Sequence, residues 1–143
     1  MSDTLTHDGG CLCGAVRFQI RLSTPTFNIC HCGMCRRWSA GPFLAVHSDG
    51  PARFSRDEGL TWYRSSRWAE RGFCSRCGAS LFWRLANRPD TLAASVEALD
   101  APERLALDRH IYIDAKPDRY DFADARPRVT EAELMAELGL SAP

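Results

Sequence analysis

Short runs of apolar and β-branched residues, broken every few positions by turn residues, predict a mainly β fold. Between Gly14 and Ile20, the apolar Val16, Phe18 and Ile20 alternate with other positions, which is the period of a half-buried strand. Turn residues such as Asp49-Gly50-Pro51 separate the runs. We expect further strands where apolar, aromatic and β-branched residues gather, at residues 43–46, 60–63, 79–85, 92–96 and 111–113.

One helix is predicted, near the C-terminal end of the chain. Thr130 and Glu133 have the spacing of a capping box, and Leu134 and Leu138 lie four positions apart on one helical face. Gly139 is a typical residue for the end of such a helix. A helix this short needs tertiary packing, so we expect it to cover the sheet, with a dimer contact as the alternative.

Composition points to a single globular domain that spans residues 1–143. The chain has 143 residues, of which 45% are hydrophobic and 25% are charged, as in ordinary globular proteins. The formal net charge is zero, with 18 basic and 18 acidic residues, so the overall charge does not favour nucleic acid as a partner. No apolar run approaches the roughly 20 residues that span a bilayer, and the polar start, Met1-Ser2-Asp3-Thr4, does not resemble a secretory signal. We therefore expect a cytoplasmic protein without a membrane partner.

Seven cysteines carry the strongest functional signal in the sequence. A structural zinc site uses four protein ligands, whereas a catalytic one uses three and keeps an open position, so seven thiols suggest one zinc of each kind. Disulfides are the competing interpretation, but an odd number of thiols in a reducing compartment argues against a disulfide framework. The thiols form a cluster of three and two separate pairs: Cys30, Cys32 and Cys35; Cys11 and Cys13; Cys74 and Cys77.

Two of the cysteine spacings suit ligands on a strand. Residues at i and i+2 of a strand share one face. Cys11 and Cys13, and likewise Cys30 and Cys32, could therefore each offer both sulfurs to a metal from a single strand edge.

Two other spacings predict tight turns. Cys74 and Cys77 have the i, i+3 spacing of a knuckle, and the following Gly78 could take the positive φ that such a turn needs. We expect the same of the Cys32–Cys35 segment, where Gly33 lies inside the knuckle.

Three cysteine motifs stand in order along the chain: Gly10-Cys11-Leu12-Cys13-Gly14-Ala15-Val16, Cys30-His31-Cys32-x-x-Cys35-Arg36-Arg37 and Phe73-Cys74-x-x-Cys77-Gly78. In these motifs, and in Arg109-His110-Ile111-Tyr112, the chain resembles the glutathione-dependent formaldehyde-activating family, which includes the centromere protein V type. The resemblance covers about residues 9–114 and leaves residues 115–143 as a tail that holds the predicted helix. It implies an Mss4-like fold of small antiparallel sheets joined by zinc sites, with a short C-terminal helix.

The resemblance also implies how the thiols divide between two zinc ions. A structural zinc would be held by one set, Cys11, Cys13, Cys74 and Cys77, and a second zinc with an open position by the other, Cys30, Cys32 and Cys35. The spacings alone leave another division open, because a zinc ribbon would pair the Cys32/Cys35 knuckle with the Cys74/Cys77 knuckle.

Three thiolate ligands determine which fourth ligand a zinc ion prefers. The thiolates leave the metal shell with a net charge of about −1, so the site polarises water poorly and suits a fourth sulfur ligand. A substrate thiol, or the sulfur of a thiol adduct, is the natural ligand. Together with the resemblance, this predicts a carbon–sulfur lyase acting on adducts of glutathione, or a similar thiol, with formaldehyde or a related aldehyde.

Residues outside the cysteines are candidates for supporting roles. His110 could exchange a proton with the hydroxyl of the adduct, although a structural histidine is the plainer interpretation. Arg36 and Arg37 could bind the carboxylates of a glutathione-like ligand, with solvated surface arginines as the alternative. Trp38 could line the pocket or simply pack in the core. His31 would face away from the metal on a strand, where we expect it to be exposed or to support the ligands from behind.

A non-catalytic function is the alternative. Both metals could be structural in a binding or scaffold module, with a fourth ligand from His47, His110 or another chain, and a thiol carrier would need the same cysteines. The neutral net charge argues against a nucleic-acid partner. That argument is weakened by a local basic group, Arg64, Arg67, Arg71 and Arg76. The sequence leaves the aldehyde, the thiol, the proton donor and the oligomeric state open.

Overall fold

The computed structural model describes residues 5–140 of the chain. The polar start, Met1–Thr4, and residues 141–143 of the expected domain lie outside the described residues. The described part is mainly β, as expected, with helices α1 (Gly33–Ser39) and α2 (Glu131–Leu138). The strands are β1 (Thr6–Gly10), β2 (Arg17–Arg21), β3 (Thr26–Cys30), β4 (Phe43–His47), β5 (Arg53–Arg56), β6 (Leu60–Arg64), β7 (Ala69–Cys74), β8 (Ser80–Leu85), β9 (Ala93–Ser95), β10 (Ala106–Ile111) and β11 (Arg128–Val129).

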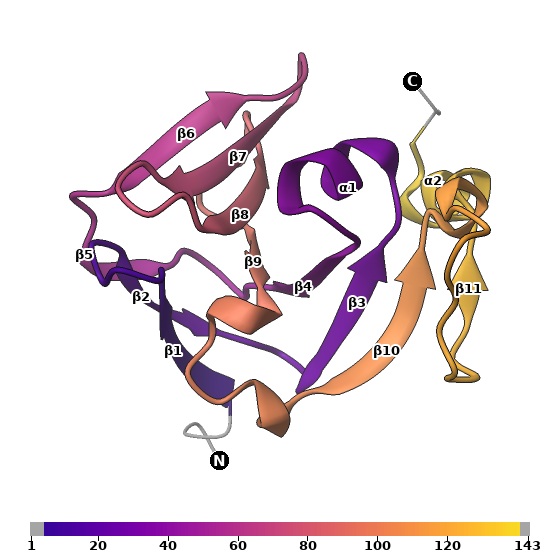
Figure 1. Ribbon diagram of the computed structural model, residues 1–143, viewed down its shortest axis with the longest axis horizontal. Coiled ribbons are helices and arrows are strands. Elements are labelled where there is room, and N and C mark those ends of the chain that lie inside the picture. The colour runs from indigo at the N-terminus through magenta and orange to yellow at the C-terminus, as the bar shows by residue number, and fades with distance from the viewer. Residues whose placement is uncertain (1–4, 141–143) are drawn as a thin grey trace.

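The strands form two sheets (Figure 1). A three-stranded sheet has the order β1-β2-β5, and an eight-stranded sheet has the order β11-β10-β3-β4-β9-β8-β7-β6. The pairing is antiparallel except that β10 runs parallel to both β3 and β11. The β3–β10 pairing places Ile111 beside Cys30, so the segment after β10 passes the three-cysteine motif.

An aromatic core joins the two sheets. Phe18 of β2 meets Phe82 of β8 edge to face, with ring centroids 4.8 Å apart, and Trp62 of β6 stacks on Phe82 at 5.9 Å. Phe82 is fully buried, as are Val16 and Ile20. Full burial of an apolar side chain of this size contributes about 1.5–3 kcal/mol, so this cluster holds the sheets together.

The prediction of a C-terminal helix is confirmed. The Thr130 hydroxyl accepts the backbone N–H of Glu133 at 3.1 Å, and the Glu133 carboxylate accepts the backbone N–H of Thr130 at 2.8 Å. Gly139 ends α2 with a φ of 70°. Leu134 and Met135 are buried, so α2 docks through them beside β10 and β11 (Figure 1). No helix within residues 5–140 is long and apolar enough to cross a bilayer.

Helix α1 corrects the expectation of a single helix. Gly33 is its first residue, so the Cys32–Cys35 segment is not a knuckle with a positive-φ glycine. The Cys32 Sγ caps the helix and accepts the backbone N–H of Cys35 at 3.3 Å. The sequence shows none of the Ser, Thr, Asp or Asn residues that usually mark a helix start, which is why α1 was not predicted.

Five of the strand predictions are confirmed, at β2, β4, β6, β8 and β9. The prediction of a strand at residues 111–113 is wrong, because β10 ends at Ile111 and Tyr112 turns the chain with a φ of 55°. Strands β1, β5, β7 and β11 were not predicted, and β3 and β10 were anticipated only at their last residues, Cys30 and Ile111. In β7, for example, Glu70 and Gly72 interrupt the apolar alternation.

Candidate metal centres

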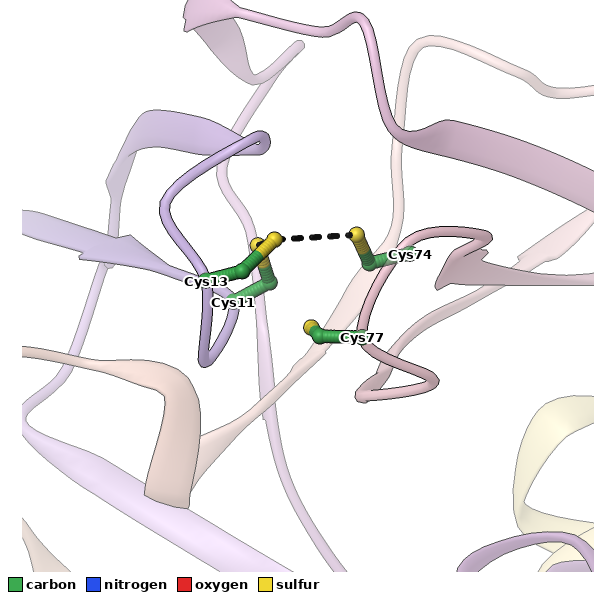
Figure 2. A group of neighbouring side chains, drawn as sticks. All are labelled: Cys11, Cys13, Cys74 and Cys77. Atoms are coloured by element: carbon green, nitrogen blue, oxygen red, sulfur yellow. Dashed lines mark hydrogen bonds between the residues drawn. The ribbon is translucent and has the colours of Figure 1, made fainter.

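The first cysteine cluster connects the two sheets. Cys11 and Cys13 lie in the loop after β1, not on a strand edge as we expected, whereas Cys74 ends β7 and Cys77 lies in the turn that follows. The four side chains point toward one another (Figure 2). The Sγ atoms of Cys11 and Cys13 are 3.7 Å apart, and those of Cys13 and Cys74 are 3.8 Å apart. Sulfurs about 2.3 Å from a tetrahedral zinc are separated by about 3.8 Å, so the cluster fits a closed zinc site.

The backbone is shaped around this cluster. Gly78 has a φ of 81°, as expected for the knuckle. A Cβ on Gly59 would lie 2.6 Å from the Cys74 Sγ, so only glycine fits there. The backbone N–H of Val16 donates to the Cys11 Sγ at 3.2 Å, which orients that sulfur toward the others.

Hydrogen bonds make one thiol of this cluster acidic. Burial raises the pKa of Cys77, but backbone N–H groups of Ala79 and Cys13 outweigh burial and lower that pKa to about 6. Such a thiol is mostly thiolate at neutral pH, and the thiolate is the form that zinc binds.

The second cluster lies where β3 passes into α1. Cys30 is the last residue of β3, Cys32 caps α1 and Cys35 lies in its first turn. The three Sγ atoms lie within 4.8 Å of one another. A strand-to-helix junction therefore brings these sulfurs together, instead of the strand edge that we expected for Cys30 and Cys32.

The three sulfurs fit a zinc ion that keeps one position open. Within residues 5–140, no further Cys, His, Asp or Glu side chain joins this group. Hydrogen bonding to the Cys30 and Cys35 thiols lowers the pKa of Cys32, whereas contacts with the Cys32 and Cys35 thiols raise the pKa of Cys30. The seven cysteines are thus grouped as the resemblance implied, and the alternative ribbon of the Cys32/Cys35 and Cys74/Cys77 segments is not formed.

Behind this cluster, three polar side chains form a hydrogen-bonded chain. His31 Nε2 is 2.8 Å from His110 Nδ1, and His110 Nε2 is 2.9 Å from a carboxylate oxygen of Asp124. Both imidazoles are fully buried, so of our two expectations for His31, exposure is wrong, and support of the ligands from behind stays a prediction. Burial and the neighbouring His110 lower the pKa of His31 to about 4, which keeps His31 neutral at pH 7. The structure does not bring His110 into the three-sulfur group.

Arg36 and Trp38 of α1 hold the helix in place. Arg36 Nε donates to the carbonyl of His31 at 3.0 Å, and its Nη2 donates to the carbonyl of Ala115 at 3.2 Å. Trp38 packs edge to face against Phe43, with ring centroids 5.2 Å apart. Both side chains therefore support the second cluster, and Trp38 forms part of its aromatic wall.

An open groove of about 770 Å³ runs beside α1. The exposed Arg37 lines it together with the apolar Met34 and an edge of Arg36. Arg119 and Tyr120, from the tail after β10, line the same groove. Sequence reasoning did not select Arg119, because no periodic pattern relates the tail to α1.

Two further side chains near the second cluster were not predicted. Arg71 of β7 was grouped with surface arginines, but it is only 4% exposed, and its Nη1 donates to the Cys35 Sγ at 3.5 Å. Tyr112 packs against the same cluster. Burial, with Glu131 and the three thiols nearby, raises the pKa of Tyr112 to about 12. The sequence could have shown the burial of Arg71 only through the alternation of inward and outward residues along β7, and β7 was not predicted.

Comparisons with known proteins agree with the cysteine pattern. The profile of the family described as glutathione-dependent formaldehyde-activating enzyme matches residues 6–115. An uncharacterized lyase of Schizosaccharomyces pombe is 33% identical over 132 residues, which cover 92% of this chain and 96% of that protein. A Halomonas elongata protein, provisionally named glutathione-dependent formaldehyde-activating enzyme, is 30% identical over 155 residues, covering 93% of this chain and 96% of that protein.

A solved structure shares the fold. The crystal structure of a Rhodobacter sphaeroides protein is similar with a TM-score of 0.56 and 27% sequence identity, and the match covers 70% of this chain and 98% of that one. The expected Mss4-like fold class, mainly β with two cysteine clusters and a short C-terminal helix, is confirmed. The chain belongs to the glutathione-dependent formaldehyde-activating enzyme family.

Proposed function

We propose that this protein is a zinc-dependent carbon–sulfur lyase that forms or cleaves adducts of glutathione, or of a similar thiol, with formaldehyde or a related aldehyde. The three-cysteine cluster carries the proposal, because no fourth Cys, His, Asp or Glu of the described chain completes it. The four-cysteine cluster would hold a structural zinc, whereas the three-cysteine cluster keeps a position for a ligand from outside. Membership of the family and the lyase name of the Schizosaccharomyces pombe relative support the same class of reaction.

The reaction requires a bound sulfur and a proton transfer at oxygen. Zinc on Cys30, Cys32 and Cys35 would supply a soft Lewis acid whose fourth ligand is the substrate sulfur. In cleavage, the carbon–sulfur bond breaks with its electron pair left on sulfur, and the adduct hydroxyl passes its proton to solvent water as the aldehyde carbonyl forms. In the reverse direction, thiolate sulfur adds to the carbonyl carbon and the oxygen takes a proton from water.

Tyr112 is the side chain that we assign to the adduct oxygen. It packs half-buried against the three-cysteine cluster, and its hydroxyl makes no hydrogen bond within the described residues. Its φ of 55° is rare for a non-glycine residue, and such backbone conformations gather at functional sites. Tyr112 Oη would donate a hydrogen bond to the oxygen of the adduct. His110, our first candidate for this role, is instead engaged by His31 and Asp124.

The groove beside α1 suits the carboxylates of glutathione. Arg37 and Arg119 line it and form no ion pair with a carboxylate of the described chain. Exposed guanidinium groups bind carboxylates through charge-assisted hydrogen bonds. Arg36 is less available to bind a substrate carboxylate, because two of its nitrogens already donate to backbone carbonyls. Arg37 and Arg119 would therefore hold the peptide part of the substrate while its sulfur lies at the cluster.

The free thiols also bear on location. The proposed zinc sites need all seven cysteines as free thiols, as they are in the structure, and thiols persist in reducing compartments. This supports a cytoplasmic location as part of the proposal.

Carbon-13 NMR exchange spectroscopy tests the proposed function. In a mixture of labelled formaldehyde and glutathione, the zinc-loaded protein should accelerate exchange between free and adduct carbon by about tenfold or more over buffer. Cys35→Ser, which removes one sulfur of the second cluster, should give the buffer rate. If the protein carries zinc at both clusters and still leaves the exchange rate unchanged, it is a binding or scaffold module instead.

A further inference from the structure

Arg71 is a buried cation without a carboxylate partner. Its side chain is 4% exposed, and it forms no ion pair with an Asp or Glu of residues 5–140. The neighbouring Glu70 pairs instead with Arg84 and Arg64. A buried charge without compensation is costly, so the anion that balances Arg71 must come from another kind of group.

The three-cysteine cluster is that group. Arg71 Nη1 lies 3.5 Å from the Cys35 Sγ, and the guanidinium carbon lies 5.0 Å from the ring centroid of Trp38. Trp38 therefore holds the guanidinium from the side of α1 by a cation–π contact. Arg71 Nε is buried and has no hydrogen-bond partner within the described residues, so the side chain still has a free donor beside the sulfurs.

The strand that carries Arg71 is fixed by the other metal centre. Cys74, on the same strand β7, belongs to the four-cysteine cluster. Residues three apart on a strand point to opposite faces, so β7 presents Arg71 to one cluster and Cys74 to the other. Gly72 lies between them, and a Cβ there would be 3.0 Å from the Trp62 ring, so β7 packs closely on β6 at this point.

We propose that Arg71 is a positioning residue that allows the three-cysteine site to accept an anionic sulfur. This proposal rests on the proposed function. Three thiolates on zinc carry about one net negative charge, and an incoming thiolate adds another. In a buried site this second charge is costly unless a cation offsets it. Arg71 offsets it, whereas a neutral ligand at the same position would gain nothing from Arg71.

Ligand selectivity of the cobalt-substituted protein tests the proposal. The probes are 2-mercaptoethanol, which binds as a thiolate, and imidazole, which binds as a neutral ligand. Arg71→Gln should weaken the affinity for 2-mercaptoethanol by about tenfold or more and leave the affinity for imidazole unchanged. Arg71→Lys, which keeps the charge, should recover part of the loss. A merely structural role would lower both affinities together.

Arg84→Gln is the matched control. Arg84 lies on the adjacent β8, pairs with Glu70 at 2.9 Å and stacks over Trp62 at 3.6 Å, so its loss should not alter the thiol-to-imidazole ratio. An unchanged ratio in Arg71→Gln would overturn the role of Arg71 even where the exchange assay shows lyase activity. Conversely, Arg71→Gln could change the thiol-to-imidazole ratio although the unsubstituted protein has no lyase activity. That result would support the positioning role of Arg71 and reject the proposed function. If Arg71→Gln does not fold, the thiol-to-imidazole ratio measured in Arg71→Met, which also lacks the charge, decides in the same way.

Discussion

His31 Nε2 lies 2.8 Å from His110 Nδ1, so the segment that bears Cys30 and Cys32 is hydrogen-bonded to a strand far along the chain. His110 in turn reaches Asp124 in the tail. The buried histidine pair therefore fastens the C-terminal tail to the back of the second cluster. These contacts satisfy both ring nitrogens of His110 and the Nε2 of His31. The Nδ1 of His31 is buried without a hydrogen-bond partner within the described residues.

Asp124→Ala should destabilise the zinc-loaded protein. The substitution leaves His110 Nε2 buried without a partner, which costs about 1–3 kcal/mol. Urea denaturation of the zinc-loaded protein measures the free energy of unfolding. Asp118→Ala is the control, because Asp118 is exposed and has no such contact. Equal stabilities of the two variants would show that the chain behind the cluster does not fasten the tail.

Replacing one sulfur in each cluster should have different consequences. Cys77→Ser opens the site that connects the two sheets, and structural zinc sites contribute about 10 kcal/mol or more to folding, so this variant should not fold. Cys35→Ser should still fold, with a smaller loss of melting temperature, and should lose the zinc of the second cluster. Metal analysis and circular dichroism measure both effects. The same loss of melting temperature in both variants would indicate two structural sites.

Removing the groove arginines should weaken glutathione binding without affecting the sulfur chemistry. Arg37→Ala and Arg119→Ala should each raise KM for glutathione by about three- to tenfold, because each loses a contact to a substrate carboxylate. With 2-mercaptoethanol, which has no carboxylate, KM should stay the same. Arg88→Ala, an exposed arginine outside the groove, is the control. A rise in KM for both thiols, or for neither, would reject the groove as the carboxylate site.

The sequence predicted best those features that depend on residues close together in the chain. The capping box of α2 and the positive φ of Gly78 follow from residues a few positions apart, and both were predicted. The grouping of the thiols depended on family motifs, because spacing alone was compatible with a zinc ribbon.

The errors fall where side chains act in unusual ways. Helix α1 begins at a cysteine that serves both as cap and as candidate metal ligand, and propensity rules assign sulfur no capping role. Arg71 was placed on the surface because Glu70 and Gly72 hide the alternation of β7. Asp124 lies in a tail without regular structure, so only the fold could show that it meets His110.

The entry of an external sulfur into the three-cysteine site is the central claim, and cobalt spectroscopy tests it most directly. Cobalt would replace zinc at both clusters, and the four-cysteine cluster would give a constant background. On titration with glutathione, the sulfur-to-cobalt charge-transfer absorbance should rise and saturate at one glutathione for each three-cysteine cluster. A spectrum that stays unchanged at saturating glutathione, with both clusters loaded, would contradict the account.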